Sequence, residues 1–275
     1  GTIRIYGTLE NPNLLGGVLL AVLPLALAAL LRWQAPWRRL YAGASLGLGL
    51  VALVLTYSRG AWMGMVASLG LMALLLALRR IRSWPPLWRR LFPVLLLVLG
   101  SAALVLLVAQ VEPLRVRVLS LVAGREDSSN NFRINVWMAA LKMVEARPWL
   151  GIGPGNEAFN LIYPLFQQPK FNALSAYSIP LEIAVETGIP GLLVLLGLLI
   201  TAVRNGLRQL RGDGAQLLPA LASLAMIVGL GVQGLTDTIF FRPEVQVIGW
   251  FALAVLSAAQ ARETTSPTPQ PPAPR

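Results

Sequence analysis

Cysteine and histidine are both absent from the 275 residues of this chain. Without cysteine there are no disulfides and no thiol nucleophiles, and without either residue type a Cys- or His-based metal site is excluded. Charged residues are scarce as well. They make up 13% of the chain, roughly half of their share in a typical soluble domain. The composition therefore excludes most soluble classes and favours a membrane protein.

Long apolar runs recur along the sequence, which is 56% hydrophobic. The first run is long enough at helical rise to cross most of the hydrocarbon layer, whereas the fifth is short unless it continues to Leu207. We therefore predict an all-α fold, a polytopic bundle of about seven transmembrane helices. The expected spans are Leu14–Leu31, Tyr41–Tyr57, Ala61–Leu78, Phe92–Ala109, Ile189–Val203, Ala215–Leu235 and Glu244–Ala261.

One long polar loop, residues 112–188, interrupts these runs. Its first predicted helix covers about Phe132–Ala146, with a cap at Asn130-Asn131, an apolar face that includes Ala140–Leu141, and a stop at Pro148. A second predicted helix covers roughly Ile179–Thr187. We expect these short amphipathic helices to lie along the membrane surface and to roof a cavity between the spans.

Arginines set the expected orientation. The loops after spans one, three and five carry net charges of +3, +5 and +2, whereas those after spans two, four and six carry +1, 0 and −1. Basic loops face the cytoplasm, so the long loop is expected on the extracytoplasmic side of the inner membrane. The net charge of +11 thus indicates topology and contact with membrane lipid rather than nucleic acid.

The ends of the chain differ from its middle. The sequence opens on Gly1 with a polar, turn-rich segment, so we interpret residues 1–263 as a single membrane domain whose earlier spans are missing. Residues 264–275 are rich in Pro, Thr and Ser and are expected to form a disordered cytoplasmic tail.

Five short motifs in a fixed order give the chain a family resemblance. The set resembles the superfamily of O-antigen ligases and polymerases of bacterial membranes. Two further stretches, SAYSIPLE (Ser175–Glu182) and FFRPEVQ, look most like the cyanobacterial branch, described as inorganic-carbon (bicarbonate) transporters. The five motifs are NPNLLGG (Asn11–Gly17), TYSRGAW (Thr56–Trp62), FRINVW (Phe132–Trp137), PWLGIGPGN (Pro148–Asn156) and ETGIPG (Glu186–Gly191).

The resemblance implies a glycan transferase that acts outside the cytoplasm on an undecaprenyl-pyrophosphate-linked donor, with no metal or other cofactor. In such an enzyme arginines neutralise the pyrophosphate leaving group, because guanidinium groups hold its oxygens in pairs. Arg59 and Arg133 match the arginines of the family by position. Arg4 and Arg242 are further candidates for the outer face.

One departure bears on catalysis. The histidine of the family ligases is replaced by Tyr177, which precedes Ser178 and the glycines Gly188 and Gly191. A tyrosine with a pKa near 10 is a poor general base at neutral pH, so ligation by the usual route is in question. Glu182 and Glu186 are the candidate substitutes.

Each candidate also has a structural interpretation. Arg59 can cap a tight turn, Arg133 can be a solvated helix residue, and Tyr177 can belong to an aromatic belt at the interface. Glu182 and Glu186 can simply line a polar cavity. The GIGPGN turn lacks the Lys-Ser/Thr of a phosphate loop and follows no strand, so it is interpreted as a turn.

Three functions stay open: a lipid-linked glycan transferase or a degenerate relative of one, an inorganic-carbon accumulation or transport factor, and a non-catalytic membrane scaffold. Whether the chain is an enzyme is thus left open, as is its oligomeric state. Bicarbonate transport would favour cationic residues near the membrane midplane, and the interiors of the expected spans carry none.

Overall fold

The computed structural model describes residues 4–9, 11–80, 124–212 and 216–265, and positions 85, 87, 88, 91, 92, 115, 116 and 119. Every regular element in these ranges is a helix, which confirms the all-α expectation. The expected fourth span, Phe92–Ala109, lies outside the described residues except for its first position. The expected tail does so too, apart from residues 264 and 265.

Five described helices are long and apolar enough to cross a membrane. A sixth, α10 (Pro243–Thr265), has a shorter apolar part, Pro243–Ala258. The described residues thus support a multi-pass bundle but contain fewer spans than the seven expected. The five spanning helices are α1 (Pro12–Arg32), α2 (Pro36–Leu55), α3 (Arg59–Arg80), α8 (Ile179–Gln209) and α9 (Leu217–Gly234).

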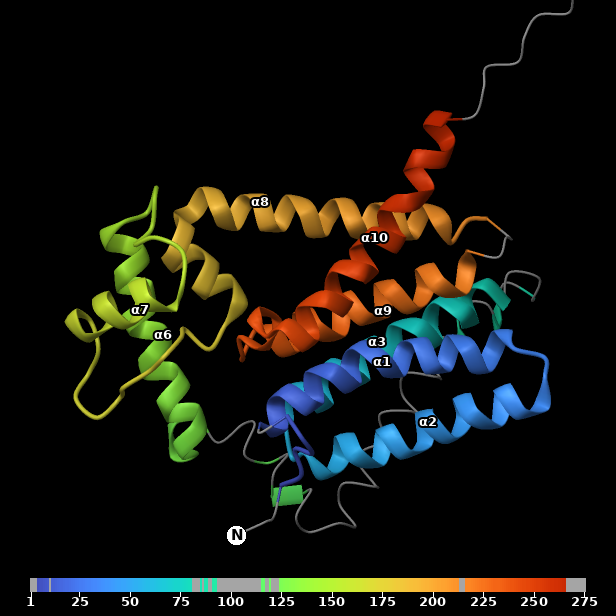
Figure 1. Cartoon of the computed structure of the whole chain (residues 1–275), viewed down its shortest axis with the longest axis horizontal. Helices are drawn as coiled ribbons and strands as arrows, with labels where there is room; N and C mark the ends of the chain where they lie inside the picture. The colour runs from blue at the N-terminus through green and yellow to red at the C-terminus, as the bar shows by residue number, and fades with distance from the viewer. Residues whose placement is uncertain are drawn as a thin grey trace, which may run out of the picture.

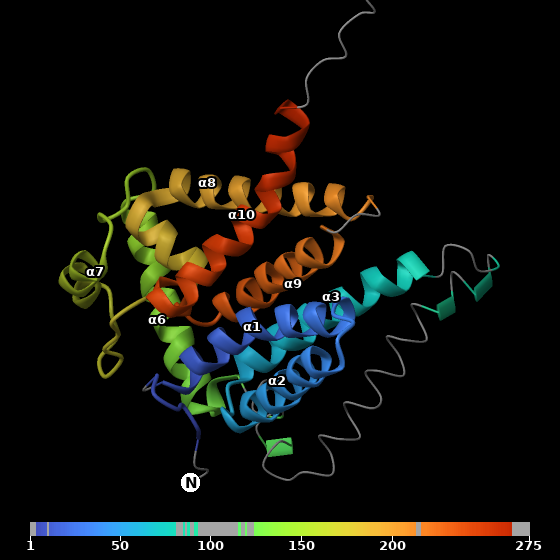
Figure 2. The same cartoon turned by 45° about the vertical axis from the view of Figure 1, so that its right-hand side comes forward.

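Helix α9 lies at the centre of the bundle and contacts α1, α3, α8 and α10 (Figures 1 and 2). Small residues let it approach α3 closely. A Cβ built on Gly64 of α3 would lie 2.6 Å from the carbonyl oxygen of Gly229, and Gly229 in turn faces Ser68. Van der Waals packing between small residues holds membrane helices together, since lipid tails are as apolar as leucine.

A compact cap sits at one end of the bundle (Figure 1). It is built from a 3₁₀ turn η2 (Gly124–Glu126), α6 (Ser128–Ala146), α7 (Asn156–Ile162), η3 (Tyr163–Leu165) and the first turns of α8. The cap has its own apolar core, in which the rings of Phe159 and Tyr163 stack with centroids 5.0 Å apart.

Helix α6 departs from its prediction in two details. Asp127, not Asn130-Asn131, is its N-cap, and its carboxylate accepts a hydrogen bond from the backbone of Asn130 at 2.9 Å. The buried face is formed by Asn135, Val136, Ala139, Ala140 and Met143, whereas Leu141, expected on the apolar face, is exposed.

Helix α8 bends at Gly188 into a short arm inside the cap and a long arm along the bundle. Gly188 has φ 74° and ψ −174°, a conformation that favours glycine. The turn after α6 fills the bend: Ile152 donates to the carbonyl of Val185 at 2.9 Å, and Ile189 donates to that of Pro148 at 2.7 Å. The glycine-rich stretch, residues 151–155, is therefore a turn with a structural role, as predicted. We call it the glycine-rich wedge, because it packs into the bend of α8.

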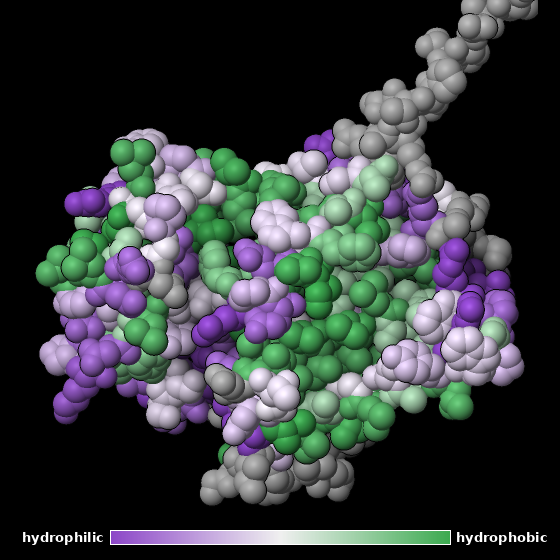
Figure 3. Space-filling model, in the orientation of Figure 1, coloured by the Kyte–Doolittle hydropathy of each residue, from purple (hydrophilic) through white to green (hydrophobic). Residues whose placement is uncertain are grey.

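The surface follows the same division. Figure 3 shows apolar residues over the middle of the bundle and hydrophilic residues at its two ends. Arg32, Arg79 and Arg208 belong to the last turns of α1, α3 and α8, at the end opposite the cap.

Candidate functional site

Four segments meet where the cap joins the bundle, and each contributes a charged or polar side chain. They are the chain before and at the start of α1, the α2–α3 turn, the start of α6, and the turn between α9 and α10. The side chains concerned are Arg4, Asn13, Arg59, Asp127, Arg133 and Asp237, which we call the arginine cluster.

Arg59 is the first residue of α3, and its position follows from the TYSRGAW turn. Thr56 Oγ1 donates to the carbonyl of Leu53, and Trp62 Nε1 donates to the same oxygen at 2.9 Å. These bonds lock the tight α2–α3 connection. A cation at a helix N-terminus opposes the helix dipole, and Arg59 is only 6% exposed. Asp127 balances this charge, because its Oδ1 lies 3.0 Å from Arg59 Nη2.

Arg133 lies in α6, six residues after Asp127, and its ion pair is longer than that of Arg59. Its Nη1 donates to Ser129 at 2.9 Å, whereas its Nη2 lies 4.0 Å from Asp237 Oδ2. Its Nε is buried and has no hydrogen-bond partner among the described residues. The Arg133–Asp237 ion pair, at 4.0 Å, is therefore longer than the Arg59–Asp127 pair, at 3.0 Å.

Asn13 connects the remaining members. Its amide nitrogen donates to Asp237 at 2.6 Å, and its amide oxygen accepts from Arg4 Nη2 at 3.0 Å. Arg4 also donates to the carbonyl of Thr56 at 2.8 Å. The NPN sequence thus serves two purposes, since Asn11 caps α1 through the backbone of Asn13.

Burial, and to a smaller extent the crowding of like charges, shifts the pKa values of the cluster. Burial lowers the pKa of the Arg4 guanidinium, and Arg133 and Arg59 lower it further. The pKa of Arg133 is lowered mainly by burial and also by Arg59, against the opposing effect of Asp237. Burial raises the pKa of the Asp237 carboxyl, although Arg133 and two hydrogen bonds counteract this effect. The cluster thus holds charges that burial penalises.

Tyr177 and Glu182 flank the cluster on the cap side. Tyr177 has a left-handed backbone (φ 50°), and its ring packs edge-on against Phe132. Burial and the nearby Asp237 raise the pKa of its hydroxyl, while Arg133 lowers it. Glu182 is 2% exposed and accepts a hydrogen bond from the backbone of Ala176, directly before Tyr177.

The other two sequence candidates lie apart. The Glu186 carboxylate accepts from the backbone of Gly155 and so belongs to the glycine-rich wedge. Arg242 is exposed, and reaches the cluster only through its electrostatic effect on Asp237. The structure therefore brings Arg4, Arg59, Arg133 and Tyr177 together, with Glu182 behind them.

Sequence reasoning missed Asn13, Asp127 and Asp237. Asp127 follows Glu126 in a polar loop, and Asp237 stands in a short turn, so both resembled solvated residues. One signal was available for Asp237, since acidic residues are rare beside the spans. Among the described residues there is no group of three acidic side chains that could hold a metal ion.

The sequence of this chain matches the model of a known protein family. The family model described as O-antigen ligase matches residues 44–196, more than half of the chain. The match includes the TYSRGAW turn, the cap and the bend at Gly188. No curated protein matches the chain. The chain belongs to the O-antigen ligase family, a family of membrane proteins of glycan transfer.

Proposed function

We propose that the arginine cluster binds the pyrophosphate of an undecaprenyl-linked glycan donor and that the protein transfers this glycan at the extracytoplasmic face of the inner membrane. The observation that carries the proposal is the long Arg133–Asp237 pair of 4.0 Å in a part-buried site. A pyrophosphate oxygen can replace Asp237 as the partner of Arg133, because a guanidinium forms short paired hydrogen bonds with phosphate.

The arginines have different roles in this proposal. Arg59 is tied to Asp127 at 3.0 Å and mainly holds α3 and α6 together. Arg133 is the principal phosphate ligand, and Arg4 supplies a second positive charge. Arg4, Arg59 and Arg133 outnumber Asp127 and Asp237 by one positive charge, which favours an anion with several oxygens.

Transfer breaks the bond between the anomeric carbon and a pyrophosphate oxygen. The oxygen of an acceptor hydroxyl forms the new bond to that carbon, and the hydroxyl proton is released to water. The departing pyrophosphate needs neutralisation more than it needs a proton, which the cluster provides. Tyr177 then acts as a hydrogen-bond donor beside Arg133 rather than as a base, since burial raises the pKa of its hydroxyl.

The test is binding of undecaprenyl pyrophosphate to the purified protein in detergent. Arg133→Gln should weaken binding about ten- to a hundredfold, because a hydrogen bond to a charged group contributes about 1.5–3 kcal/mol. Arg133→Lys should restore part of the loss, since lysine keeps the charge without the paired donors. Arg147→Gln is the matched control, because Arg147 is exposed at the far end of α6. Equal losses in Arg147→Gln and Arg133→Gln would contradict the proposal.

Inorganic-carbon transport is the alternative, in line with the resemblance to the cyanobacterial branch. It predicts uptake of labelled bicarbonate by proteoliposomes. The described spans carry charged residues only toward their ends, so no observation favours this function over transfer. A scaffold would show neither bicarbonate uptake nor donor binding.

A further inference from the structure

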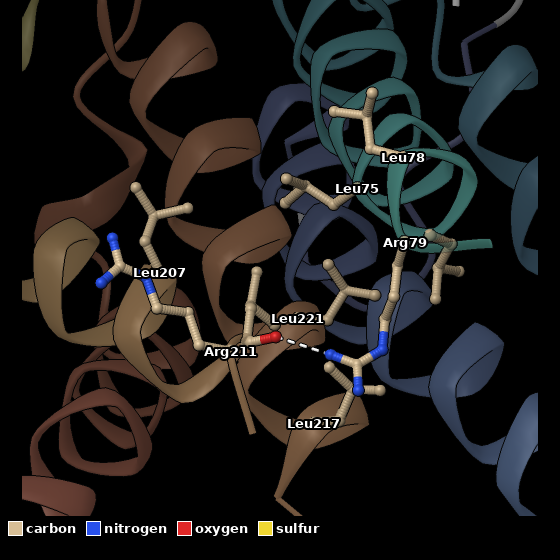
Figure 4. Close-up of a pocket in the computed structure, with 9 residues that line it drawn as sticks. Leu75, Leu78, Arg79, Leu207, Arg211, Leu217 and Leu221 are labelled. Carbon is tan, nitrogen blue, oxygen red and sulfur yellow. Dashed lines mark hydrogen bonds between the residues drawn. The ribbon is translucent and has the colours of Figure 1, made fainter. Parts of the chain in front are cut away.

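A second basic site lies at the opposite end of the bundle from the arginine cluster. Between the last turns of α3 and α8 and the first turns of α9 there is a cavity of about 290 Å³. Leu75, Leu207, Leu217 and Leu221 are among the residues that line it, together with Arg79 and Arg211 (Figure 4). This volume equals about ten water molecules in the liquid, but the wall is mostly leucine and suits a hydrocarbon chain.

Arg79 fixes the shape of this cavity. Its Nη1 donates to the carbonyl oxygen of Leu210 at 2.6 Å, which joins the end of α3 to the end of α8. In Figure 4 the Arg79 side chain reaches across to the end of α8, whereas the Arg211 side chain points away from Arg79. The two arginines and the leucines line the same cavity, so the leucine-lined space has a basic edge.

A second cavity of about 280 Å³ adjoins the first on the α8 side. Its lining residues are Arg204, Leu207, Arg208 and Arg211, so the two cavities share Leu207 and Arg211. Arg204 and Arg208 are four residues apart in α8 and therefore lie on one face of the helix, and Arg211, just after the helix, lines the same cavity. Like charges at this spacing repel one another, and within the part of the chain that the structure describes no acidic residue lines either cavity. A bound anion would relieve that repulsion.

We propose that these adjoining cavities bind one anionic phospholipid, with an acyl chain among the leucines and the headgroup phosphate against Arg204, Arg208 and Arg211. The chemistry of the two cavities matches the two parts of such a lipid. Basic pockets between membrane helices bind anionic headgroups, and the leucine chamber takes hydrocarbon that a free phosphate lacks. The site is separate from the arginine cluster and does not depend on the glycan-transfer proposal.

The experiment measures retained lipid. The full chain is extracted from membranes that contain phosphatidylglycerol and phosphatidylcholine, delipidated in detergent, and examined by native mass spectrometry. We expect one phosphatidylglycerol to stay bound to the wild-type protein in preference to phosphatidylcholine. Excess inorganic phosphate should not displace it, because the acyl chain contributes to binding.

Two variants test the two parts of the site. Arg208→Gln with Arg211→Gln should reduce the retained phosphatidylglycerol at least fivefold by removing the headgroup contacts. Leu207→Trp should reduce it similarly, because the indole fills the space shared by both cavities. Leu207 is 44% exposed, so the larger side chain can be accommodated.

The matched control is Arg38→Gln with Arg39→Gln, an exposed pair in the first turn of α2 at the same end of the bundle. This control should retain the lipid within twofold of wild type. An equal loss in the control would mean general attraction of lipid to a basic surface and would overturn the proposal. Retention in both test variants, displacement by inorganic phosphate, or equal retention of phosphatidylcholine would overturn it as well.

Discussion

Arg59 and Arg133 interact electrostatically because Asp127 brings α3 and α6 together. The one carboxylate caps α6 through the backbone of Asn130 and pairs with the guanidinium of Arg59. Arg59 and Arg133 are far apart in the sequence, so their arrangement in the cluster depends on Asp127.

Replacement of Asp127 should separate its two roles. Asp127→Asn keeps a capping oxygen but loses the charge opposite Arg59, whereas Asp127→Ala loses both. We expect the free energy of unfolding of Asp127→Ala to be about 1 kcal/mol lower than that of Asp127→Asn, the typical contribution of an N-cap side chain. Both should melt below wild type in a thermal unfolding assay in detergent. Glu126→Gln is the control, because Glu126 is exposed, and a melting temperature lowered as far as in Asp127→Asn would refute the role of the pair.

Asp237 should compete with a bound phosphate. Asp237→Asn should bind undecaprenyl pyrophosphate roughly fivefold more tightly at pH 8, because it releases Arg133 from an ion pair of about 1 kcal/mol. The pKa of Asp237 is raised above 3.8, so its carboxyl is neutralised as the pH falls through the raised pKa. The advantage of the Asn variant should therefore shrink as the pH is lowered from 8 toward the raised pKa of Asp237.

The ratio of the two dissociation constants is the quantity to follow, since protonation of the ligand affects both proteins equally. A ratio that stays constant with pH would show that Asp237 does not compete. The raised pKa of Asp237 also makes the stability of the folded protein depend on pH. A raised folded-state pKa contributes stability that is present below pH 3.8 and is lost as the pH rises through the folded value.

Glu182 should position Tyr177 and not act as a base. Glu182→Gln keeps an oxygen for the backbone of Ala176 and should bind the donor within threefold of wild type. Glu182→Ala loses that contact, and its affinity should fall about tenfold, in line with a lost hydrogen bond of about 1.5 kcal/mol. If single-turnover transfer is measured, a rate abolished by Gln with binding intact would identify Glu182 as the base instead.

Gly188 should not tolerate a side chain. A Cβ at this position would lie 2.5 Å from the carbonyl oxygen of Trp149, and φ of 74° is strained for alanine. Gly188→Ala should therefore destabilise the protein by more than about 2 kcal/mol. Gly197→Ala in the same helix is the control, because nothing lies within 4 Å of its Cβ. Equal yields of folded, monodisperse protein for both variants would contradict the claim that the packing around Gly188 excludes a side chain.

Orientation can be tested directly because the chain has no cysteine. Single cysteines at Glu126 in the cap and at Gln34 between α1 and α2 lie at opposite ends of the bundle. We expect a membrane-impermeant maleimide to label the first in intact cells and the second only after lysis. Labelling of both from outside would refute the proposed outer site.

The spans could be predicted because each is an apolar run bounded by arginines or turn residues. The first three predicted spans lie inside α1, α2 and α3, apart from Thr56 and Tyr57 in the α2–α3 turn. Helix α7 could not be predicted in this way, since NEAFNLI is seven residues long and begins at a glycine without a side-chain cap. Phe159 is its buried side chain, and it packs in a core that residues of α6 and α8 complete.

The candidate arginines could be identified from motifs and charge alternation, but their partners could not. Asp237 and Asn13 meet across most of the chain, and no local pattern indicates such a contact. The face of α6 was misjudged for a related reason. Leu141 is apolar but exposed, whereas the polar Asn135 is buried because its amide donates to the carbonyl of Asn131.

The short arm of α8 limits how the cap can be handled as a fragment. Val185 is fully buried in the cap core and Leu181 packs against it, yet both belong to a helix that continues into the bilayer. A water-soluble piece that stops before Leu181 would expose Val136 and Met143 and would aggregate. Antibodies or crystals of the cap therefore require a fragment that extends at least through Ile189, the residue that closes the bend by donating to Pro148.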